Sequence, residues 1–148
     1  TNVVNGKFIF KGELLQPCWA AVCIDGMDGI FTVLENGNIR FCTDGKEGWC
    51  EGTPINDVFQ KSWREYQVLN QAGIDAFKKL DSLNVETERK KELYAITREK
   101  VIKQTKEFIK RTVYENLDNI IPAFWIRIFQ EQITVDELNA MLADASPC

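Results

Sequence analysis

The sequence changes character at Gly52-Thr53-Pro54. Before this point, apolar residues alternate with polar ones and are interrupted by turn residues, as in β-strands. After it, apolar residues recur every three to four positions almost to the C-terminus, as in α-helices. Strands and helices segregated in this way predict an α+β fold of one domain. We expect a small antiparallel β-sheet over residues 1–52, followed by a mainly antiparallel helical region of about four helices over residues 53–148.

Five short segments of the first half have the pattern of strands. They cover residues 7–11, 18–24, 30–35 and 38–43 and a stretch around Trp49 and Cys50. Asn36-Gly37, between the third and fourth segments, is the strongest short-range hairpin signal in the chain. A two-residue loop at this point places Thr32 opposite Phe41, so these two strands are expected to pair.

The five cysteines are spaced neither as a zinc site nor as a redox pair. If residues 44–48 form the loop of a simple hairpin, Cys42 lies opposite Cys50, and the two are candidates for a structural disulfide. The alternative is that both are buried thiols that behave as small hydrophobic side chains. Cysteine usage therefore permits export to an oxidising compartment without requiring it.

Two long helices are expected next. Thr53 is suited to be the N-cap of a helix with Pro54 at its first position, and its apolar stripe fades at residues 82–84. A second helix is expected from about Glu86 to Glu115, with most of its lysines facing outward. Two such helices joined by a short turn form an antiparallel hairpin.

A third helix is predicted over residues 120–129, capped by Asn119 and with Pro122 in its first turn. This helix has little polar surface, so it must be covered on nearly all sides. Core packing is the default explanation. The alternative is an interface with a partner domain or a second copy, formed by Phe124, Trp125, Ile128 and Phe129.

A fourth, short helix is predicted from a capping box, in which Thr134 is followed three residues later by Glu137. Its apolar residues are expected to face inward: Leu138, Met141 and Leu142.

Charge is distributed unevenly along the chain. Residues 89–111 hold nine lysines and arginines against three glutamates, a net charge of +6, whereas the whole chain is −4 and the remainder is therefore −10. Because glutamates are interleaved with the lysines, a solvated helix face explains the basic residues. The acidic remainder would repel a phosphate backbone, so no nucleic-acid partner is expected.

The sequence lacks the residues of common catalytic sites. It has no histidine, no Cys-x-x-Cys, no Gly-rich phosphate loop and no Gly-x-Ser-x-Gly motif. A catalytic cysteine would need an activating neighbour that the sequence does not suggest. We therefore predict no catalytic residue, no cofactor and no metal site, and expect the chain not to be an enzyme.

With the strands placed, three segments occur in a recognisable order: residues 4–12 (Val-Asn-Gly-Lys-Phe-Ile-Phe-Lys-Gly), residues 33–39 around Asn36-Gly37, and residues 51–56 around Gly52-Thr53-Pro54. Together with the long helical hairpin and the Asn116-x-x-Asn119 junction, they resemble a domain family of unknown function in Gram-negative envelope proteins. Domains of this family often lie N-terminal to a thioredoxin-like domain of the TlpA/ResA type. The resemblance covers nearly the whole chain.

The resemblance implies a non-catalytic accessory domain of a periplasmic or envelope-associated thiol-disulfide oxidoreductase-like protein, which itself carries the oxidoreductase domain. The role would be dimerisation or the presentation of a client or partner. The partner would be the thioredoxin-like domain of the same protein or a second copy. Family strands upstream and the thioredoxin-like domain downstream would then be missing from this chain.

The resemblance implies an exported or lipid-anchored parent. The chain begins at Thr1-Asn2-Val3 without an initiator Met or a leader, so any targeting peptide is expected to have been removed or left out. No stretch is apolar for long enough to predict a transmembrane segment. A free-standing periplasmic ligand-binding protein is the alternative, with a pocket between the sheet and the helical hairpin. Its lining would be Trp19, Phe31, Trp63 and Tyr66.

Overall fold

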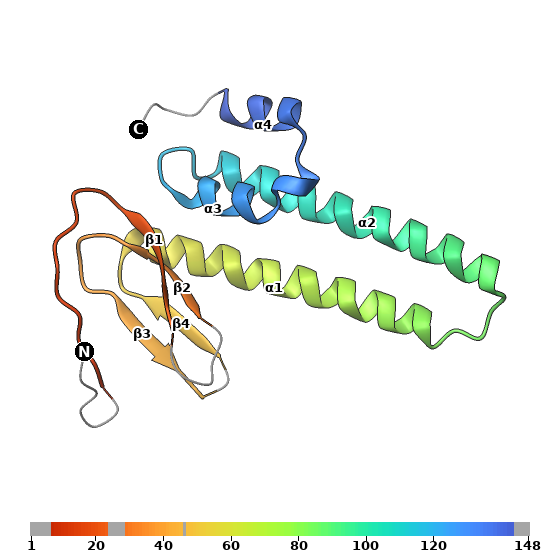
Figure 1. Ribbon diagram of the computed structural model, residues 1–148, viewed down its shortest axis with the longest axis horizontal. Coiled ribbons are helices and arrows are strands. Elements are labelled where there is room, and N and C mark those ends of the chain that lie inside the picture. Colours follow the sequence, from red (N-terminus) through yellow and green to blue (C-terminus); the bar gives the residue numbers. More distant parts are fainter. Residues whose placement is uncertain (1–6, 24–28, 46, 144–148) are drawn as a thin grey trace. The chain divides into compact units, whose positions relative to one another are not determined.

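The computed structural model describes residues 7–23, 29–45 and 47–143, and these have the predicted α+β fold (Figure 1). Four strands come first, followed by four α-helices and one 3-10 turn: β1 (Cys18–Val22), β2 (Ile30–Leu34), β3 (Arg40–Thr43), β4 (Gly48–Glu51), α1 (Pro54–Asp81), α2 (Thr87–Tyr114), α3 (Ile121–Ile128), η1 (Gln130–Gln132) and α4 (Val135–Leu142). The chain divides into two compact units, a strand unit (Thr1–Asn56) and a helical unit (Asp57–Cys148). The boundary lies close to the predicted change from strands to helices.

In its described residues, the strand unit has two antiparallel pairs instead of one continuous sheet. β1 pairs with β2, with Trp19 opposite Val33, and β3 pairs with β4, with Phe41 opposite Cys50. The expected pairing across Asn36-Gly37 is therefore wrong. The Asn36 side chain instead bonds to the backbone of Leu14, accepting from its N–H at 3.2 Å and donating to its carbonyl at 2.9 Å.

Asn56 explains why β2 needs no second strand beside Val33. The Asn56 amide accepts from the Val33 N–H at 2.8 Å and donates to the Val33 carbonyl, as a neighbouring strand would. Its oxygen also accepts from the Thr32 hydroxyl, and its nitrogen donates to the Thr53 hydroxyl. Asn56 is fully buried, and a buried amide is tolerated only when it is hydrogen-bonded in this way.

The expected strand over residues 7–11 is not formed, since only Lys7 makes an isolated bridge. Ile9 and Phe10 are largely exposed. Phe8 has packing partners, with its ring 5.4 Å from that of Phe10 and 6.4 Å from that of Phe41. Residues 8–11 therefore lie outside the two strand pairs.

The proposed Cys42–Cys50 disulfide is also wrong in this structure. The loop between β3 and β4 is one residue shorter than expected, so Cys42 lies opposite Trp49 instead of opposite Cys50. A shift of one residue turns a side chain to the other face of the pair, and the two sulfurs therefore point to opposite faces. Cys42 and Cys50 are thiols. The Cys50 thiol is buried and donates to the Asn56 side-chain oxygen at 3.3 Å.

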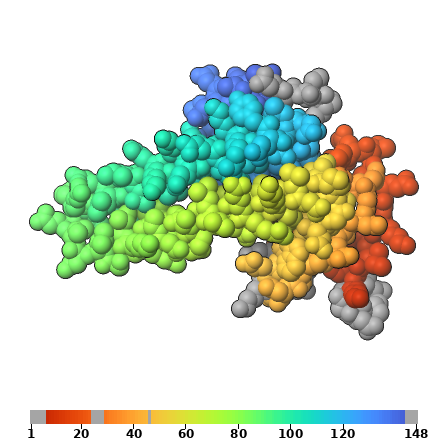
Figure 2. All heavy atoms as spheres, turned by 180° about the vertical axis from the view of Figure 1, so that it is seen from behind, coloured from red at the N-terminus to blue at the C-terminus, as the bar shows by residue number. Residues whose placement is uncertain are grey.

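The long hairpin of α1 and α2 has the predicted bounds to within one or two residues. The two helices run side by side in both views (Figures 1 and 2). Their contacts show the antiparallel register, because Tyr66 meets Phe108 near one end and Phe77 stacks on Tyr94 near the other. At the tip, the Tyr94 hydroxyl donates to the Asp81 carboxylate, a hydrogen bond that raises the pKa of Tyr94.

Helix α3 packs an aromatic core within the helical unit. Trp125 is fully buried, and its indole N–H donates to the Ser62 hydroxyl at 3.3 Å. Six aromatic rings surround the Trp125 ring at centroid distances of 4.9–6.4 Å. They belong to Phe59, Trp63 and Tyr66 of α1, Phe108 of α2, Phe124 of α3 and Phe129 just after α3.

The expectation that the third helix offers an interface is corrected by this packing. Phe124, Trp125 and Phe129 are buried inside the chain and have no surface to offer a partner. Ile128 alone of the four expected interface residues is half exposed. The aromatic residues of α3 are buried against α1 and α2, as the core-packing explanation predicted.

Helix α4 begins with the predicted capping box, in which the Thr134 hydroxyl accepts from the Glu137 N–H and the Glu137 carboxylate accepts from the Thr134 N–H. Met141 faces inward as expected and Leu138 is half-buried, whereas Leu142 is exposed. In the part of the chain that the structure describes, no helix combines the length and the hydropathy required to cross a membrane.

We predict that Asn56→Ala lowers the free energy of unfolding by roughly 3 kcal/mol, because it leaves the buried N–H and carbonyl of Val33 unpaired. A urea titration followed by near-UV circular dichroism measures this. Asn70→Ala, at an exposed position of α1, is the matched control and should cost nothing. Equal effects of the two substitutions would contradict the role given to Asn56.

We predict that Trp125→Ala costs about 3–5 kcal/mol of stability, the usual range for deleting a large buried aromatic side chain. Ile128→Ala, three residues later on the exposed side of the same helix, should cost under about 1 kcal/mol. If Trp125→Ala lowered the free energy of unfolding no more than Ile128→Ala does, the aromatic core would not be the centre of the helical unit.

Candidate functional site

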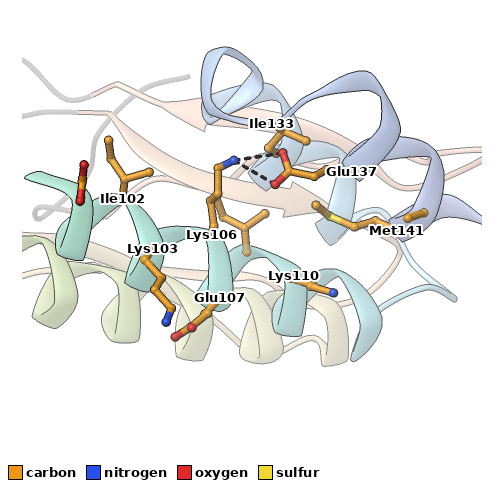
Figure 3. Close-up of a pocket in the computed structure, with 11 residues that line it drawn as sticks. Ile102, Lys103, Lys106, Glu107, Lys110, Ile133, Glu137 and Met141 are labelled. Atoms are coloured by element: carbon orange, nitrogen blue, oxygen red, sulfur yellow. Dashed lines mark hydrogen bonds and ion pairs between the residues drawn. The ribbon is translucent and has the colours of Figure 1, made fainter.

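A groove of about 430 Å³ lies between α2 and α4 in the helical unit. In Figure 3, Ile102 and Lys106 of α2 point toward the side of α4, where Ile133 and Glu137 lie, whereas Lys103 and Glu107 point away from it. The residues that line the groove fall into two groups. The apolar ones are Ile102, Ile109, Ile133, Ala140 and Met141, and the charged ones are Glu99, Lys103, Lys106, Glu107, Lys110 and Glu137.

The apolar floor follows from the spacing of residues on α2. Ile102 and Ile109 are seven residues apart, so they lie on one face of the helix, two turns from each other. Ile109 is buried and Ile102 is half-buried, and Met141 of α4 is buried on the opposite side. The floor is therefore apolar over two helical turns, although part of it remains accessible.

One ion pair crosses the groove and ties its walls together. The Lys106 ammonium on α2 donates to both carboxylate oxygens of Glu137 on α4, at 2.9 and 3.0 Å (Figure 3). Glu137 also accepts from the Thr134 N–H at 2.8 Å in the capping box. The same carboxylate therefore starts α4 and joins that helix to α2.

These contacts stabilise the ionised form of Glu137. Acceptance from the Thr134 backbone N–H, followed by the hydrogen bond from Lys106, lowers the pKa of Glu137 from 4.5 to about 2. Partial burial acts in the opposite direction and is outweighed. Glu137 is thus a positioned anion with a structural role, not an acid that exchanges protons near neutral pH.

The charged side chains that line the groove balance one another. Lys106 is paired with Glu137, and α2 otherwise contributes two lysines, Lys103 and Lys110, and two glutamates, Glu99 and Glu107. The lining of the groove therefore carries no net charge.

The four residues expected to line a pocket lie in different units. Trp63 and Tyr66 belong to the aromatic core of the helical unit, with their rings 6.0 Å apart and each against Trp125. Partial burial raises the pKa of Tyr66. Trp19 lies on β1 and Phe31 on β2 in the strand unit. The pocket itself stays a prediction.

Sequence reasoning missed the groove because it treated the outward residues of α2 as one solvated face. Ile102 and Ile109, seven residues apart beside the basic positions, were the available signal. What a helical pattern cannot reveal is that α4 returns to this face of α2. One of the contacts between α4 and α2 is the Lys106–Glu137 pair, whose members are 31 residues apart.

In residues 7–23, 29–45 and 47–143, no three side chains of histidine, cysteine, aspartate or glutamate come together as a metal site. Comparison with models of protein families, with curated proteins and with solved structures gave no match.

We predict that nuclear magnetic resonance titration of the Glu137 carboxyl gives a pKa of about 2. Because the folded-state pKa is lower than the ordinary value of 4.5, the stability contributed by this group is present above pH 4.5 and lost as pH falls toward 2. Lys106→Met should raise the pKa but leave it below 4.5, since the Thr134 N–H remains. An ordinary pKa in the unmodified chain would contradict the capping-box and ion-pair geometry.

Proposed function

We propose that this chain is a non-catalytic accessory domain that presents a partner or client, and that it serves an envelope thiol-disulfide oxidoreductase-like protein. The observation that carries the proposal is the groove between α2 and α4, with an apolar floor and charged walls. A groove between two helices is a common site for binding a protein segment. The resemblance of residues 4–12, 33–39 and 51–56 to the envelope family supplies the periplasmic setting and the thioredoxin-like partner.

The construction of the groove supports a binding role. Glu137 and Lys106 satisfy each other, so the walls are held together before any partner arrives. A site formed in advance loses less conformational entropy on binding. The floor residues Ile102 and Ile133 are half-buried instead of fully covered, which leaves apolar surface for a partner to bury.

The alternative of a free-standing ligand-binding protein has weaker support. Trp63 and Tyr66, two of the four residues assigned to its pocket, already make close ring contacts inside the helical unit. A second copy of the chain remains a candidate partner, but Phe124, Trp125 and Phe129 do not provide its interface because they are core residues.

The coding sequence beyond Cys148 provides a direct test of the biological setting. A downstream Cys-x-x-Cys in a thioredoxin-like domain would support the accessory role. A stop codon immediately after Cys148 would contradict it and favour the ligand-binding alternative.

We predict that the isolated chain does not reduce insulin above background in a dithiol-coupled turbidity assay. Cys42 and Cys50 lie on opposite faces of the β3–β4 pair, so they cannot act as a vicinal dithiol, and the chain has no histidine to activate a thiol. Thioredoxin is the positive control. Measurable turnover that disappears in Cys42→Ala or Cys50→Ala would contradict the non-catalytic assignment.

A further inference from the structure

We propose that Asn36 is a modification site, at which spontaneous deamidation removes the side-chain amide and releases residues 8–16 from the rest of the strand unit. The inference goes beyond the proposed function and does not involve the α2–α4 groove. It follows from three observations: the Asn36-Gly37 dipeptide, the availability of its reacting groups, and the two hydrogen bonds that join Asn36 to Leu14.

Deamidation is a reaction of asparagine with the backbone nitrogen of the next residue. That nitrogen adds to the side-chain carbonyl carbon, so that a new C–N bond forms and the bond from this carbon to the amide nitrogen breaks. The proton of the backbone N–H leaves with the amide nitrogen as ammonia, and the product is a cyclic imide. Water then opens the imide to aspartate or isoaspartate. Glycine favours the addition because it has no Cβ to hinder the approach.

The structure leaves the reacting groups of Asn36-Gly37 available. Both residues are exposed and lie in a bend outside the two strand pairs, so water reaches them. Among the described residues, no hydrogen bond involves the Gly37 N–H, the attacking group. The Asn36 side-chain oxygen accepts from the Leu14 N–H at 3.2 Å. This donor faces the oxygen on which negative charge develops as the nitrogen adds.

The fold requires glycine at position 37, so the reactive dipeptide is part of the architecture. The φ of Gly37 is +152°, and a Cβ at this position would lie 2.7 Å from the Thr53 Cγ2. Any other residue would therefore be strained here. Asn38 is also exposed, but Ile39 follows it, and a β-branched side chain hinders the addition of the nitrogen. Deamidation is therefore expected at Asn36 and not at Asn38.

Deamidation breaks one of the two hydrogen bonds between Asn36 and Leu14. The Asn36 amide nitrogen donates to the Leu14 carbonyl at 2.9 Å. A carboxylate oxygen in its place only accepts, so two acceptors would face each other. Glu13 lines the same hollow of about 570 Å³ as Leu14 and Asn36, so the new carboxylate also meets a like charge. The contact that holds Leu14 is therefore lost.

Contacts near its two ends join the segment of residues 8–16 to later parts of the strand unit. Leu14 is bonded to Asn36, and the ring of Phe8 lies 6.4 Å from that of Phe41. Lys11 lies between these two points and is exposed. Because the segment belongs to neither strand pair, loss of the Leu14 contact leaves the chain around Lys11 free to open locally.

Tryptic peptide mapping after incubation in mildly alkaline buffer tests the site. Trypsin cuts after Lys11 and Arg40, so Asn36 and Asn38 fall in one peptide, apart from the other Asn-Gly dipeptide at residues 5–6. Tandem mass spectrometry should place the mass gain of deamidation on Asn36 and leave Asn38 unchanged, with a sample digested before incubation as the control. An Asn36 that stays intact in the folded chain while the isolated peptide deamidates would overturn the proposal.

Limited proteolysis tests the release of the segment. Under native conditions, trypsin should cleave after Lys11 about 5-fold faster in the deamidated chain, because losing one hydrogen bond raises the open population by about that factor. Asn36→Asp should give the same acceleration without incubation. Asn38→Asp adds the same charge at an exposed position and should leave the rate unchanged.

Equal cleavage rates after Lys11 in the unmodified chain, the deamidated chain and Asn36→Asp would overturn the release. An equal acceleration in Asn38→Asp would also overturn it, because added charge alone would then be the cause. If Asn36→Asp prevents folding, the comparison of the chain before and after incubation still decides the matter, since it needs no substitution.

Discussion

The packing around Trp125 is the interaction on which the helical unit depends. Its ring meets Phe59 and Tyr66 of α1, Phe108 of α2, and Phe129 at the end of α3, in mostly tilted or edge-to-face arrangements that aromatic quadrupoles favour. This packing fixes α3 against the hairpin. Because η1 and α4 follow α3 directly, it also determines where α4 begins, and the Lys106–Glu137 pair completes the return of α4 to α2. The groove thus depends on a buried indole that does not line it.

The strand unit depends on a polar constraint instead. Asn56 takes the place of a neighbouring strand for Val33, and Asn36 bonds in the same two-point manner to Leu14. Asn56 thereby satisfies backbone groups of β2 that a neighbouring strand would have paired through a ladder. The hydrogen bonds of Asn56 with Val33 are buried, whereas those of Asn36 with Leu14 are exposed, so Asn56 is the residue that replaces a ladder partner inside the strand unit.

Features encoded by nearby residues were predictable from the sequence. Helix α1 begins at Pro54, α4 begins with the Thr134–Glu137 capping box, and the core role of the third helix follows from its composition. Strand pairing was not predictable, because the hairpin preference of Asn36-Gly37 is overcome by the side-chain bonds of Asn36 and Asn56. A one-residue difference in the β3–β4 loop was enough to separate Cys42 from Cys50. The groove escaped prediction because it depends on contacts between residues distant in sequence.

Binding in the α2–α4 groove is the central functional claim, and methyl nuclear magnetic resonance tests it most directly. On titration with a synthetic amphipathic helix that carries a leucine stripe, the methyl signals of Ile102, Ile133 and Met141 should shift together and saturate at one stoichiometric equivalent. The methyl of Ile74, exposed on α1 and outside the groove, should not shift. Saturating shifts at Ile74 with none at Ile102 and Ile133 would place the partner elsewhere and contradict the account.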